Sequence, residues 1–183
     1  MPFVHETAIV EPGAQLGDDT SVWHHAHVRN GARVGAGCVV GKNVYIDVHA
    51  VVGDRCKIQN NVSVYHGVTI GNDVFVGPSA TFTNDRVPRA FNAEWEVTPT
   101  VVNDGASIGA NATIVCGVTL GEYCMVAAGA TVTHDVQPYQ LVRGTPARHA
   151  GWVCRMGHVI SRDVHIPDTM HCPHCDQSTR SAE

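Results

Sequence analysis

Leucine, aromatic side chains and charged residues are scarce in this chain of 183 residues. It has 3 Leu against 29 Val, and aromatic and charged residues make up 6% and 16% of it. Leucine is favoured in helical cores, whereas valine loses rotamer freedom in a helix and packs well on a pleated sheet. The composition therefore excludes an all-helical protein. At this length it favours one β domain with at most a small appendage.

The chain also lacks a basic field and a long apolar segment. Lys and Arg number 12 against 17 Asp and Glu, for a formal net charge of −5, which argues against a nucleic-acid or anionic-membrane partner. No apolar run approaches the ~20 residues that cross a bilayer, and the start, MPFVHETAIVEPG, does not resemble a signal peptide. Seven cysteines, an odd number, predict reduced thiols and a cytoplasmic location.

What the chain has in abundance is a repeat of six residues. From Val4 to Phe82 every sixth residue is apolar, and the residue four positions later is small or slim. The register returns from Val102 to Val132. A period of six fits neither a helix face nor an alternating strand, but it suits a solenoid of very short strands joined by tight turns. Three hexads make one triangular coil, so the sequence predicts an all-β parallel β-helix of six to seven coils.

Residues one coil apart are expected to lie above one another. Cys38 and Cys56 share an inward position, and Cys124 returns to it after the repeat is interrupted. We therefore expect three buried, unreactive thiols. The turn 24–27, His-His-Ala-His, could be taken for a metal site, but successive turn side chains point in different directions. Its histidines are expected to be solvated or to contact another subunit.

The repeat breaks once, and about 14 residues, 88–101, are predicted to form a loop extruded from a corner of the coil. A solenoid tolerates an insertion only outside its stacked strands, and such loops often carry function. Beside this loop, the stacking places His66, Asn84 and Cys116 in one file. The file is therefore the candidate site of chemistry.

The residue types in this file predict acid–base chemistry. A neutral imidazole at His66 can take a proton from an amine nucleophile near pH 7, although a solvated turn histidine is the simpler interpretation. The Asn84 amide can hold a hydroxyl or polarise a carbonyl, and Asp85 can hold a sugar or an ammonium group. Cys116 would allow a covalent acyl-cysteine, but the sequence shows no orienting partner for that nucleophile.

Several stretches of the chain resemble one enzyme family: KIQNNVSVYHGVTIGNDVFVGPSATFTNDRVPRA, the earlier SVWHHAHVRNGARVG, and ATIVCGVTLGEYCMVAAGATVTHDV followed by YQLVRGTPARHAGW. They are similar to the hexapeptide-repeat nucleotide-sugar N-acetyltransferases that acetylate a 3-amino group, of the WlbB/WbpD-like and QdtC/FdtC-like types. The resemblance covers nearly all of residues 4–153. It implies a left-handed coil, a homotrimer with active sites between subunits, acetyl-CoA as cosubstrate and a nucleotide-linked amino sugar as substrate.

The resemblance also implies roles for individual residues. Asn84 would contact the sugar or the reacting acyl group, His66 would lie next to the amine, and Arg148 would bind the phosphate end of coenzyme A. The amine would attack the thioester directly, and a backbone N–H of a turn glycine in the later coils would stabilise the oxyanion. Further substrate contacts would be Asp85, Arg89, Gln59 and Asn60, and further coenzyme contacts would be Gly129 and Ala128.

After residue 150 the hexads cease, so we divide the chain into a catalytic β-helix, 1–150, and a tail, 151–183. Cys172 and Cys175 form a CxxC pair, and Cys154 with His158 can complete a Cys3His structural zinc site. Relatives with such a tail resemble a zinc ribbon in which a second CxC pair stands where this chain has Cys-Arg-Met. A tail without metal therefore stays open, as does substitution by another histidine: His165, His171 or His174.

Three other functions compete with this hypothesis. A γ-class carbonic anhydrase uses the same solenoid but needs three converging histidines, and after the loop the solenoid offers only His134. A non-catalytic or ice-binding solenoid would show a flat threonine face, whereas the threonines here are scattered. Other hexapeptide acyltransferases, acting on serine, lipid A precursors or small amines, share the repeat.

Overall fold

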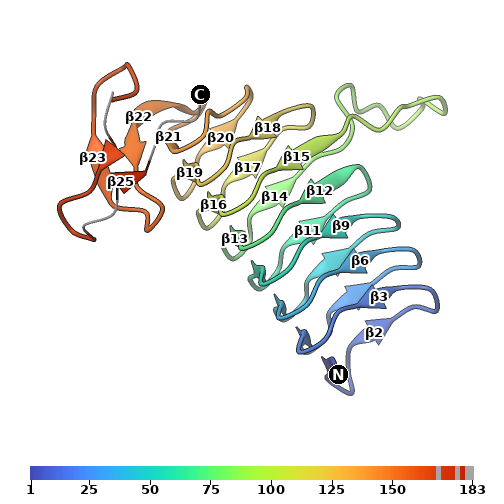
Figure 1. Ribbon diagram of the computed structural model, residues 1–183. Coiled ribbons are helices and arrows are strands. Elements are labelled where there is room, and N and C mark those ends of the chain that lie inside the picture. Colours follow the sequence, from blue (N-terminus) through green and yellow to red (C-terminus); the bar gives the residue numbers. More distant parts are fainter. Residues whose placement is uncertain (168–169, 176–177, 180–183) are drawn as a thin grey trace.

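The computed structural model describes residues 1–167, 170–175 and 178–179, and within them every regular element is a β-strand. Short strands follow one another and trace triangular coils stacked along one axis (Figure 1). The parallel β-helix predicted from the six-residue repeat is confirmed. The described residues contain no helix long and apolar enough to cross a membrane.

Three sheets form the walls of the coil. Sheet 1 has ten strands in the order β1 (Phe3–Val4), β4 (Ser21–Val22), β7 (Val39–Val40), β10 (Lys57–Ile58), β13 (Phe75–Val76), β16 (Ser107–Ile108), β19 (Met125–Val126), β21 (Gln140–Arg143), β22 (Arg148–Val153) and β23 (Val159–Ser161). Sheet 2 has seven strands: β2 (Ile9–Val10), β5 (His27–Val28), β8 (Tyr45–Ile46), β11 (Ser63–Val64), β14 (Thr81–Phe82), β17 (Thr113–Ile114) and β20 (Thr131–Val132). Sheet 3 has six strands: β18 (Thr119–Leu120), β15 (Thr100–Val102), β12 (Val68–Ile70), β9 (Val51–Val52), β6 (Arg33–Val34) and β3 (Gln15–Leu16). A separate pair in the tail joins β24 (Met170–His171) and β25 (Ser178–Thr179).

The coils stack with the register that the repeat predicts. Ile46 pairs with Val64 in sheet 2, one coil apart, and the parallel pairing continues through the loop, where Phe82 pairs with Ile114. Six coils have three named strands, a bridge between Leu120 and Val136 closes a seventh, and β21 begins an eighth. The stack is therefore slightly longer than the predicted six to seven coils. The last coil has 16 residues, from Met125 to its partner Leu141, whereas the hexad count predicts 18.

The interior of the prism is filled by the two apolar positions of each hexad. The last residue of each coil strand from β4 to β20 points inward, and the small residue after the next turn meets it. Val28, Ile46 and Val64 are 0% exposed, as are the small partners Ala32 and Ala50. The inward file thus excludes water from the second coil onward, and burial of these side chains is the main stabilising contribution of the fold.

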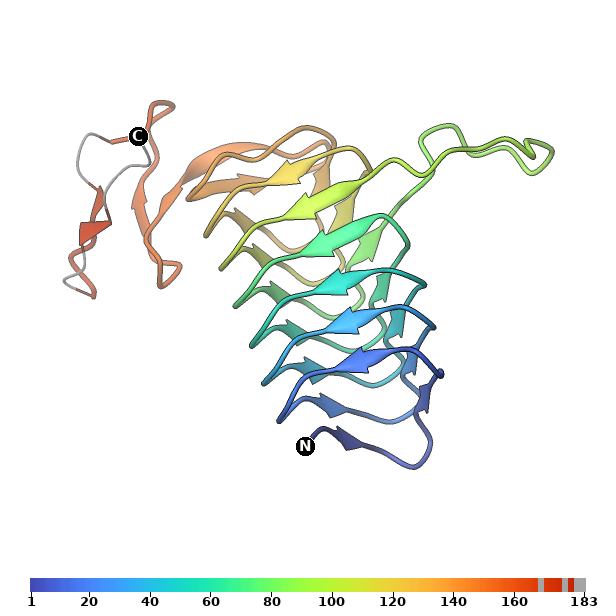
Figure 2. The same cartoon turned by 45° about the vertical axis from the view of Figure 1, so that its right-hand side comes forward.

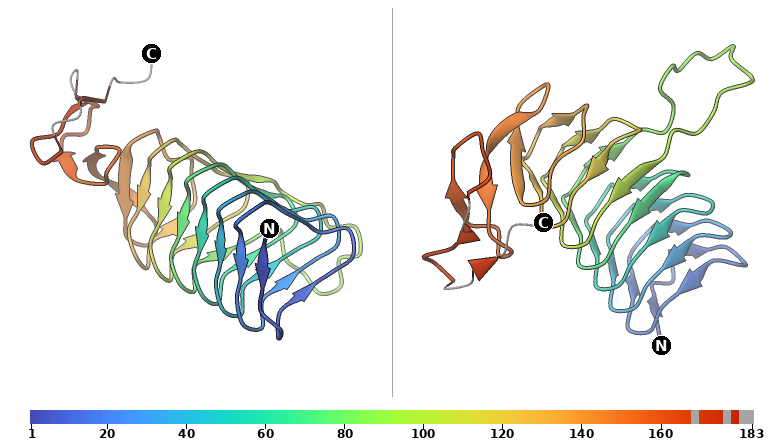
Figure 3. Two further views of the ribbon diagram at one scale, coloured as in Figure 1. Left: turned by 60° about the horizontal axis from the view of Figure 1, so that its bottom comes forward. Right: turned by 45° about the horizontal axis from the view of Figure 1, so that its top comes forward.

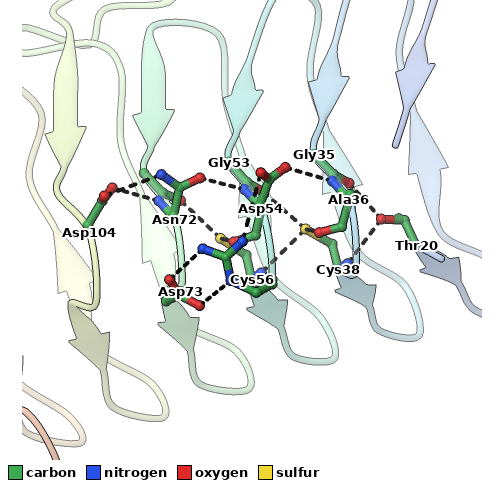
Figure 4. Close-up of polar contacts among 12 residues, drawn as sticks. Thr20, Gly35, Ala36, Cys38, Gly53, Asp54, Cys56, Asn72, Asp73 and Asp104 are labelled. Atoms are coloured by element: carbon green, nitrogen blue, oxygen red, sulfur yellow. Dashed lines mark hydrogen bonds and ion pairs between the residues drawn. The ribbon is translucent and has the colours of Figure 1, made fainter. Parts of the chain in front are cut away.

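Polar side chains line the corner between sheets 3 and 1 (Figure 4). The Thr20 hydroxyl donates to Gly35 O at 2.6 Å and accepts from Cys38 N at 3.0 Å. The Cys38 thiol repeats the pattern one coil later, donating to Gly53 O at 3.1 Å and accepting from Cys56 N at 3.3 Å. These thiols therefore satisfy buried backbone groups. The predicted burial of Cys38, Cys56 and Cys124 is confirmed, and burial raises the pKa of Cys124 to about 12.

The loop departs from and returns to the coil at other residues than predicted. The expected segment was 88–101, but Thr100 N donates to Gly67 O at 3.0 Å and Val101 N donates to Val118 O at 3.2 Å. Both residues therefore belong to β15, where register with β12 is recovered. The repeat fixes how many residues are in excess but not where the excess is placed.

The tail continues sheet 1. Strand β22 crosses the predicted boundary at residue 150, pairs antiparallel with β21, and pairs with β23 on its other side. Trp152 is 2% exposed and packs with Tyr139 and Met170 in a second, smaller core. Figure 3 shows the tail at the end of the stack opposite the N-terminus. The tail is thus attached to the last coils by hydrogen bonds and packing.

We expect the replacement Phe82→Ala to lower the free energy of unfolding by about 3–5 kcal/mol, because Phe82 is 1% exposed and its loss leaves a cavity in the prism. The matched control is Phe91→Ala, because Phe91 in the loop is 86% exposed and should cost little. Urea unfolding monitored by circular dichroism measures both. Equal costs for the two variants would contradict the inward assignment of the hexad position.

Candidate active site

The corner between sheets 2 and 3, called here the loop corner, carries the predicted file. It comprises the turns that follow β11, β14, β17 and β20, which include 65–67, 83–99, 115–117 and 133–135. His66, Asn84 and Cys116 each stand two residues beyond a residue of the stacked series Val64, Phe82 and Ile114 of sheet 2. His66 and Asn84 are half-buried, and Cys116 is 0% exposed. The burial of Cys116 argues against a covalent acyl-cysteine.

The backbone of His66 is held by a carboxylate from the preceding coil. Asp47 Oδ2 accepts from His66 N at 3.2 Å, while Asp47 Oδ1 accepts from the Tyr45 hydroxyl at 2.9 Å and from Val48 N at 2.8 Å. Burial by itself would raise the pKa of Asp47, but these donors outweigh it and the pKa lies below its ordinary value. The His49 ring meets the His66 ring edge-on, with centroids 5.7 Å apart. The turn that presents His66 is therefore anchored to the turn of the preceding coil through both its backbone and its ring.

A chain of paired charges continues from this anchor toward the N-terminal coils. Arg29 Nε lies 2.6 Å from Glu11 Oε1, Arg29 Nη1 donates to the Tyr45 hydroxyl at 2.8 Å, and His27 Nε2 lies 2.8 Å from Glu11 Oε1. The pKa of Glu11 is lowered, first by the N–H of Asn30 and then by His27 and Arg29. These groups contact one another in one network, which orders the coil surface below His66.

The loop projects away from the stacked coils (Figure 2). A backbone hydrogen bond to Asn84 joins its two ends. Thr98 N donates to Asn84 O at 3.0 Å, and Asp85 Oδ1 accepts from Val87 N at 2.8 Å. Gly67, with φ +90°, lies under the returning strand, where a Cβ would collide with the Val97 side chain. The two ends of the loop are therefore held together beside the turn that carries His66.

Arg89, predicted to contact substrate, stays on the exposed part of the loop. Its Nη1 donates to Pro88 O at 2.8 Å. A hollow of about 280 Å³ in the loop is lined by Asp85, Arg86 and Trp95 among others, but not by Arg89. The structure thus does not join Arg89 to the other predicted substrate contacts within one chain.

Gln59 and Asn60 lie at a different corner, between sheets 1 and 2, called here the tryptophan corner. It comprises the turns after β4, β7, β10 and β19, which include 23–25, 41–43, 59–61 and 127–129. Gln59 and Asn60 line a hollow of about 320 Å³ there. Strand β11 separates them from His66. The six residues from Asn60 to His66 limit the distance between these two residues to about 20 Å.

The predicted coenzyme contacts are also divided. Ala128 lies at the tryptophan corner and lines an almost wholly apolar hollow of about 350 Å³ with Phe75, Met125 and Leu141. Gly129 follows it with φ +69°, and a Cβ there would meet no atom within 4 Å. Arg148 lines another hollow, of about 410 Å³, at the C-terminal end of the loop corner.

Sequence reasoning missed the partners of these residues. Trp23, His24 and Lys42 line the hollow of Gln59 and Asn60, and each stands a multiple of 18 residues from one of them. The stacking arithmetic applied to this corner would have found them. The hollow of Arg148 also holds residues that the sequence analysis left without a role: His134, Asp135, Gln140 and His149.

The tail brings the four predicted metal ligands together. The ligand atoms of Cys154, His158, Cys172 and Cys175 all lie within 4.8 Å of one another. His158 Nδ1 is 3.6 Å from the thiols of Cys154 and Cys172, and the thiols of Cys175 and Cys154 are 3.8 Å apart. Of the alternative ligands, His165, His171 and His174 are not members of this cluster.

The repeat identifies the protein family. Residues 13–47, 49–84 and 99–134 match the bacterial transferase hexapeptide (six repeats) family, and residues 31–66 match the hexapeptide repeat of succinyl-transferase. The chain belongs to the bacterial transferase hexapeptide family. The gap between the last two matched segments contains the loop, so the insertion lies outside the repeats that define this transferase family.

Solved structures of acetyltransferases share the fold of this hexapeptide-family chain. A hexapeptide-repeat acetyltransferase from Vibrio cholerae O1 biovar eltor, complexed with acetyl coenzyme A, is 29% identical with a TM-score of 0.58, covering 75% of this chain and 70% of that one. PerB from Caulobacter crescentus, in complex with CoA and GDP-perosamine, is 21% identical with a TM-score of 0.53, covering 82% of this chain and 57% of that one. At the identity of PerB, the likeness shows the fold alone.

Curated relatives of this hexapeptide-family chain match a short segment. An acyl-[acyl-carrier-protein]–UDP-N-acetylglucosamine O-acyltransferase from Saccharophagus degradans is 41% identical over 46 residues, which is 25% of this chain and 18% of that protein. The same enzyme from Brucella ovis is 46% identical over 44 residues, which is 24% of this chain and 16% of that protein. The chain thus spans less than a fifth of the length of these relatives.

We expect the free energy of unfolding to fall as the pH is lowered from about 5 toward 2, because the folded-state pKa values of Glu11, Asp47 and Asp73 are lowered. A carboxyl whose folded pKa is depressed stabilises the fold above its unfolded value of about 4, and this contribution disappears as the pH falls through the folded pKa. Asp47→Asn should cost about 1–2 kcal/mol at pH 7 and make the acid slope shallower. Chemical denaturation at several pH values measures this. An acid slope in Asp47→Asn as steep as in the wild type would contradict the assignment.

Proposed function

We propose that this chain is an acetyl-CoA-dependent N-acetyltransferase that acetylates the 3-amino group of a nucleotide-linked sugar. The observation that carries the proposal is that a half-buried imidazole, His66, and a half-buried amide, Asn84, follow the paired strands β11 and β14 at the base of the loop. The membership of the hexapeptide transferase family supports the transferase class, and the Vibrio cholerae acetyltransferase solved with acetyl coenzyme A supports the donor.

The reaction is a direct transfer. The amine nitrogen attacks the thioester carbonyl, a C–N bond forms, the C–S bond breaks, and coenzyme A leaves as a thiolate. The amine proton goes to His66 or to the departing thiolate. Among the turn glycines of the later coils, Gly117 and Gly129 donate their N–H groups to Pro99 O and Ala110 O, so these two N–H groups are already engaged. We therefore assign the oxyanion to the Asn84 amide.

We also propose a homotrimer with active sites between subunits, which would bring the assigned residues together. The predicted contacts lie on two corners of one prism, and a site between copies would place the loop corner of one chain near the tryptophan corner of the next. The loop also exposes large apolar side chains, with Phe91 at 86% and Trp95 at 45% exposure. Exposed apolar groups on a projecting loop are typical of a contact with another chain.

A second candidate function follows from the curated relatives, which are acyl-carrier-protein-dependent O-acyltransferases. In that function the donor is an acyl carrier protein and the acceptor is a hydroxyl. The two candidates are distinguished by the donor, because release of free coenzyme A thiol from acetyl-CoA occurs only in the first. Assaying amino and hydroxy sugar nucleotides with both donors separates them.

We expect Asn84→Ala to lower kcat by about 100-fold or more, because it removes the amide donor to the oxyanion. His66→Ala should lower kcat by about 100-fold near neutral pH, since general acid–base catalysis contributes at least that much. Both are measured as release of coenzyme A thiol with a panel of amino sugar nucleotides. Ser63→Ala, on the outer face of β11, is the control and should keep kcat.

The pH profile separates the two proton acceptors. A kcat of His66→Ala equal to that of the wild type from pH 6 to 9 would leave the thiolate as acceptor and remove His66 from the mechanism. An Asn84→Ala variant with wild-type kcat would overturn the assigned site. Circular dichroism of each variant establishes that the coil is retained.

We further propose that the tail holds a structural zinc ion. A tetrahedral zinc with Zn–S bonds of about 2.3 Å and a Zn–N bond of about 2.0 Å separates two thiolates by about 3.8 Å and a thiolate from a nitrogen by about 3.6 Å. The distances of 3.8 Å between Cys175 and Cys154 and 3.6 Å from His158 agree with both values. Four protein ligands leave no open position, as in structural sites. The ion would fasten β24 to the strands β22 and β23.

We expect one zinc per chain in protein purified without chelator, by plasma mass spectrometry. Cys172→Ala should lose the metal and lower the melting temperature, because the three cysteine ligands are buried or half-buried and the tail core adjoins them. His174→Ala is the matched control, since His174 lies beside His158 but outside the cluster, and should keep the metal. Cobalt substitution should give the visible absorption of a tetrahedral thiolate site. Substoichiometric zinc in the wild type, or its loss in His174→Ala, would contradict the proposed ligand set.

A further inference from the structure

The tryptophan corner presents an unusual set of side chains in its N-terminal coils. Trp23 is 40% exposed although it is a large aromatic residue. With His24, Lys42, Gln59 and Asn60 it lines a hollow of about 320 Å³. An indole, an ammonium group and two amides around one hollow combine a stacking surface, a positive charge and hydrogen-bonding groups.

The coil register explains why a hollow forms at this place. Trp23, Gly41 and Gln59 occupy one file, and His24, Lys42 and Asn60 occupy the next. Gly41 has no side chain because a Cβ would come within 2.7 Å of Asn60 Oδ1 and 2.9 Å of Asn60 N. The long side chains of Trp23 and Gln59 therefore lie on either side of a glycine. Their backbone positions are two coil spacings, or about 9.6 Å, apart. The gap between Trp23 and Gln59 is built into the stack.

The walls of the hollow are ordered by contacts with the rest of the coil. The Trp23 ring packs at 5.4 Å from Phe3 and lies parallel to His24, within 6°. His24 in turn stacks on His5 with centroids 3.5 Å apart. Asn60 Oδ1 accepts from Lys42 N at 2.9 Å, which fixes the amide. The aromatic surface is thus held in place before any ligand arrives.

Lys42 places a positive charge at this corner, in a chain whose net charge is −5. The pKa of His24 is lowered, first by its partial desolvation and then by the neighbouring His5, His25 and Lys42, with Glu6 acting in the opposite direction. The ammonium group of Lys42 is the partner for an anion. An aromatic face beside a cation and amides fits a nucleotide, because a base stacks on the ring, a phosphate meets the cation, and amides hydrogen-bond to the base edge or the ribose.

We propose that this hollow is the subsite for the nucleoside diphosphate end of the acceptor, with Trp23 as the stacking surface and Lys42 as the phosphate partner. The inference rests on the proposed function, since it assigns one end of the same nucleotide-linked substrate. It also gives the turn 23–25 a role other than metal binding, and it adds Trp23 and Lys42 to the predicted contacts Gln59 and Asn60.

The test measures nucleotide binding directly, with UDP, dTDP and GDP and no sugar. Titration calorimetry and quenching of tryptophan fluorescence report the affinity of the full chain. We expect at least one nucleotide to bind the wild type, Trp23→Ala to weaken it at least tenfold, and Trp23→Phe to abolish most of the quenching while retaining binding. Lys42→Ala should weaken binding by several-fold, with a reduced dependence on salt.

The controls come from the chain itself. Lys57→Ala removes the other lysine of the chain, which stands one coil away on sheet 1 and does not line the hollow, and it should bind as the wild type does. Trp95→Phe should keep the quenching, because Trp95 lies in the loop. Light scattering after size exclusion shows whether Trp23→Ala changes the assembly.

Three results would overturn the subsite: no binding of any of the three nucleotides, wild-type affinity in both Trp23→Ala and Lys42→Ala, or dissociation of the assembly in Trp23→Ala, which would make Trp23 a subunit contact. The proposed function fails in a different way. Acetyl transfer with an unchanged KM in Trp23→Ala would leave the function standing without the subsite. Trp23-dependent nucleotide binding with no thiol release from acetyl-CoA would leave the subsite standing without the function.

Discussion

The hydrogen bonds between successive coils determine nearly everything else in this molecule. Each short strand donates to and accepts from the strands directly above and below it, so a residue has its vertical neighbours fixed by counting along the chain. A strand of two residues is too short to be stable alone, and only the stack supplies its partners. Packing of valine and small residues inside the prism then makes this register the only one that buries both apolar positions.

This constraint turns each corner of the prism into a set of vertical files. A side chain at a corner meets the residues one coil away, as Asp47 meets the backbone of His66. A glycine in such a file opens space, as Gly41 does between Trp23 and Gln59, and a thiol or hydroxyl in an inward file can satisfy a backbone carbonyl of the next coil, as in Thr20 and Cys38. The residues of a functional site are therefore expected at intervals of one coil along the chain rather than in a contiguous motif.

The parts of the structure that follow the hexad could be predicted from the sequence. The prism, the burial of Cys38 and Cys56, and the shared file of His66 and Asn84 depend only on the count. The exact bounds of the loop could not be predicted from the count. The count gives the number of excess residues but not which of them return to the sheet, and the hydrogen bond from Thr100 N to Gly67 O determines that return point. The tail has no repeat, so the CxxC pair of Cys172 and Cys175 could indicate candidate metal ligands but not the antiparallel strands β22 and β23 that lie beside them. The same count also predicts that Gln59 and His66 lie on two different corners. The sequence analysis did not apply it to Gln59, because it followed only the file of His66 and Asn84.

The loop interrupts the sequence without interrupting the sheet. Ile70 pairs with Val102 across the insertion with the same geometry that Val52 and Ile70 have one coil earlier, and a single backbone hydrogen bond between Thr98 and Asn84 closes its neck. The strand pairing that stabilises the solenoid therefore does not depend on the residues of the loop. The length and composition of the loop can therefore change in evolution while the coil that carries it stays the same.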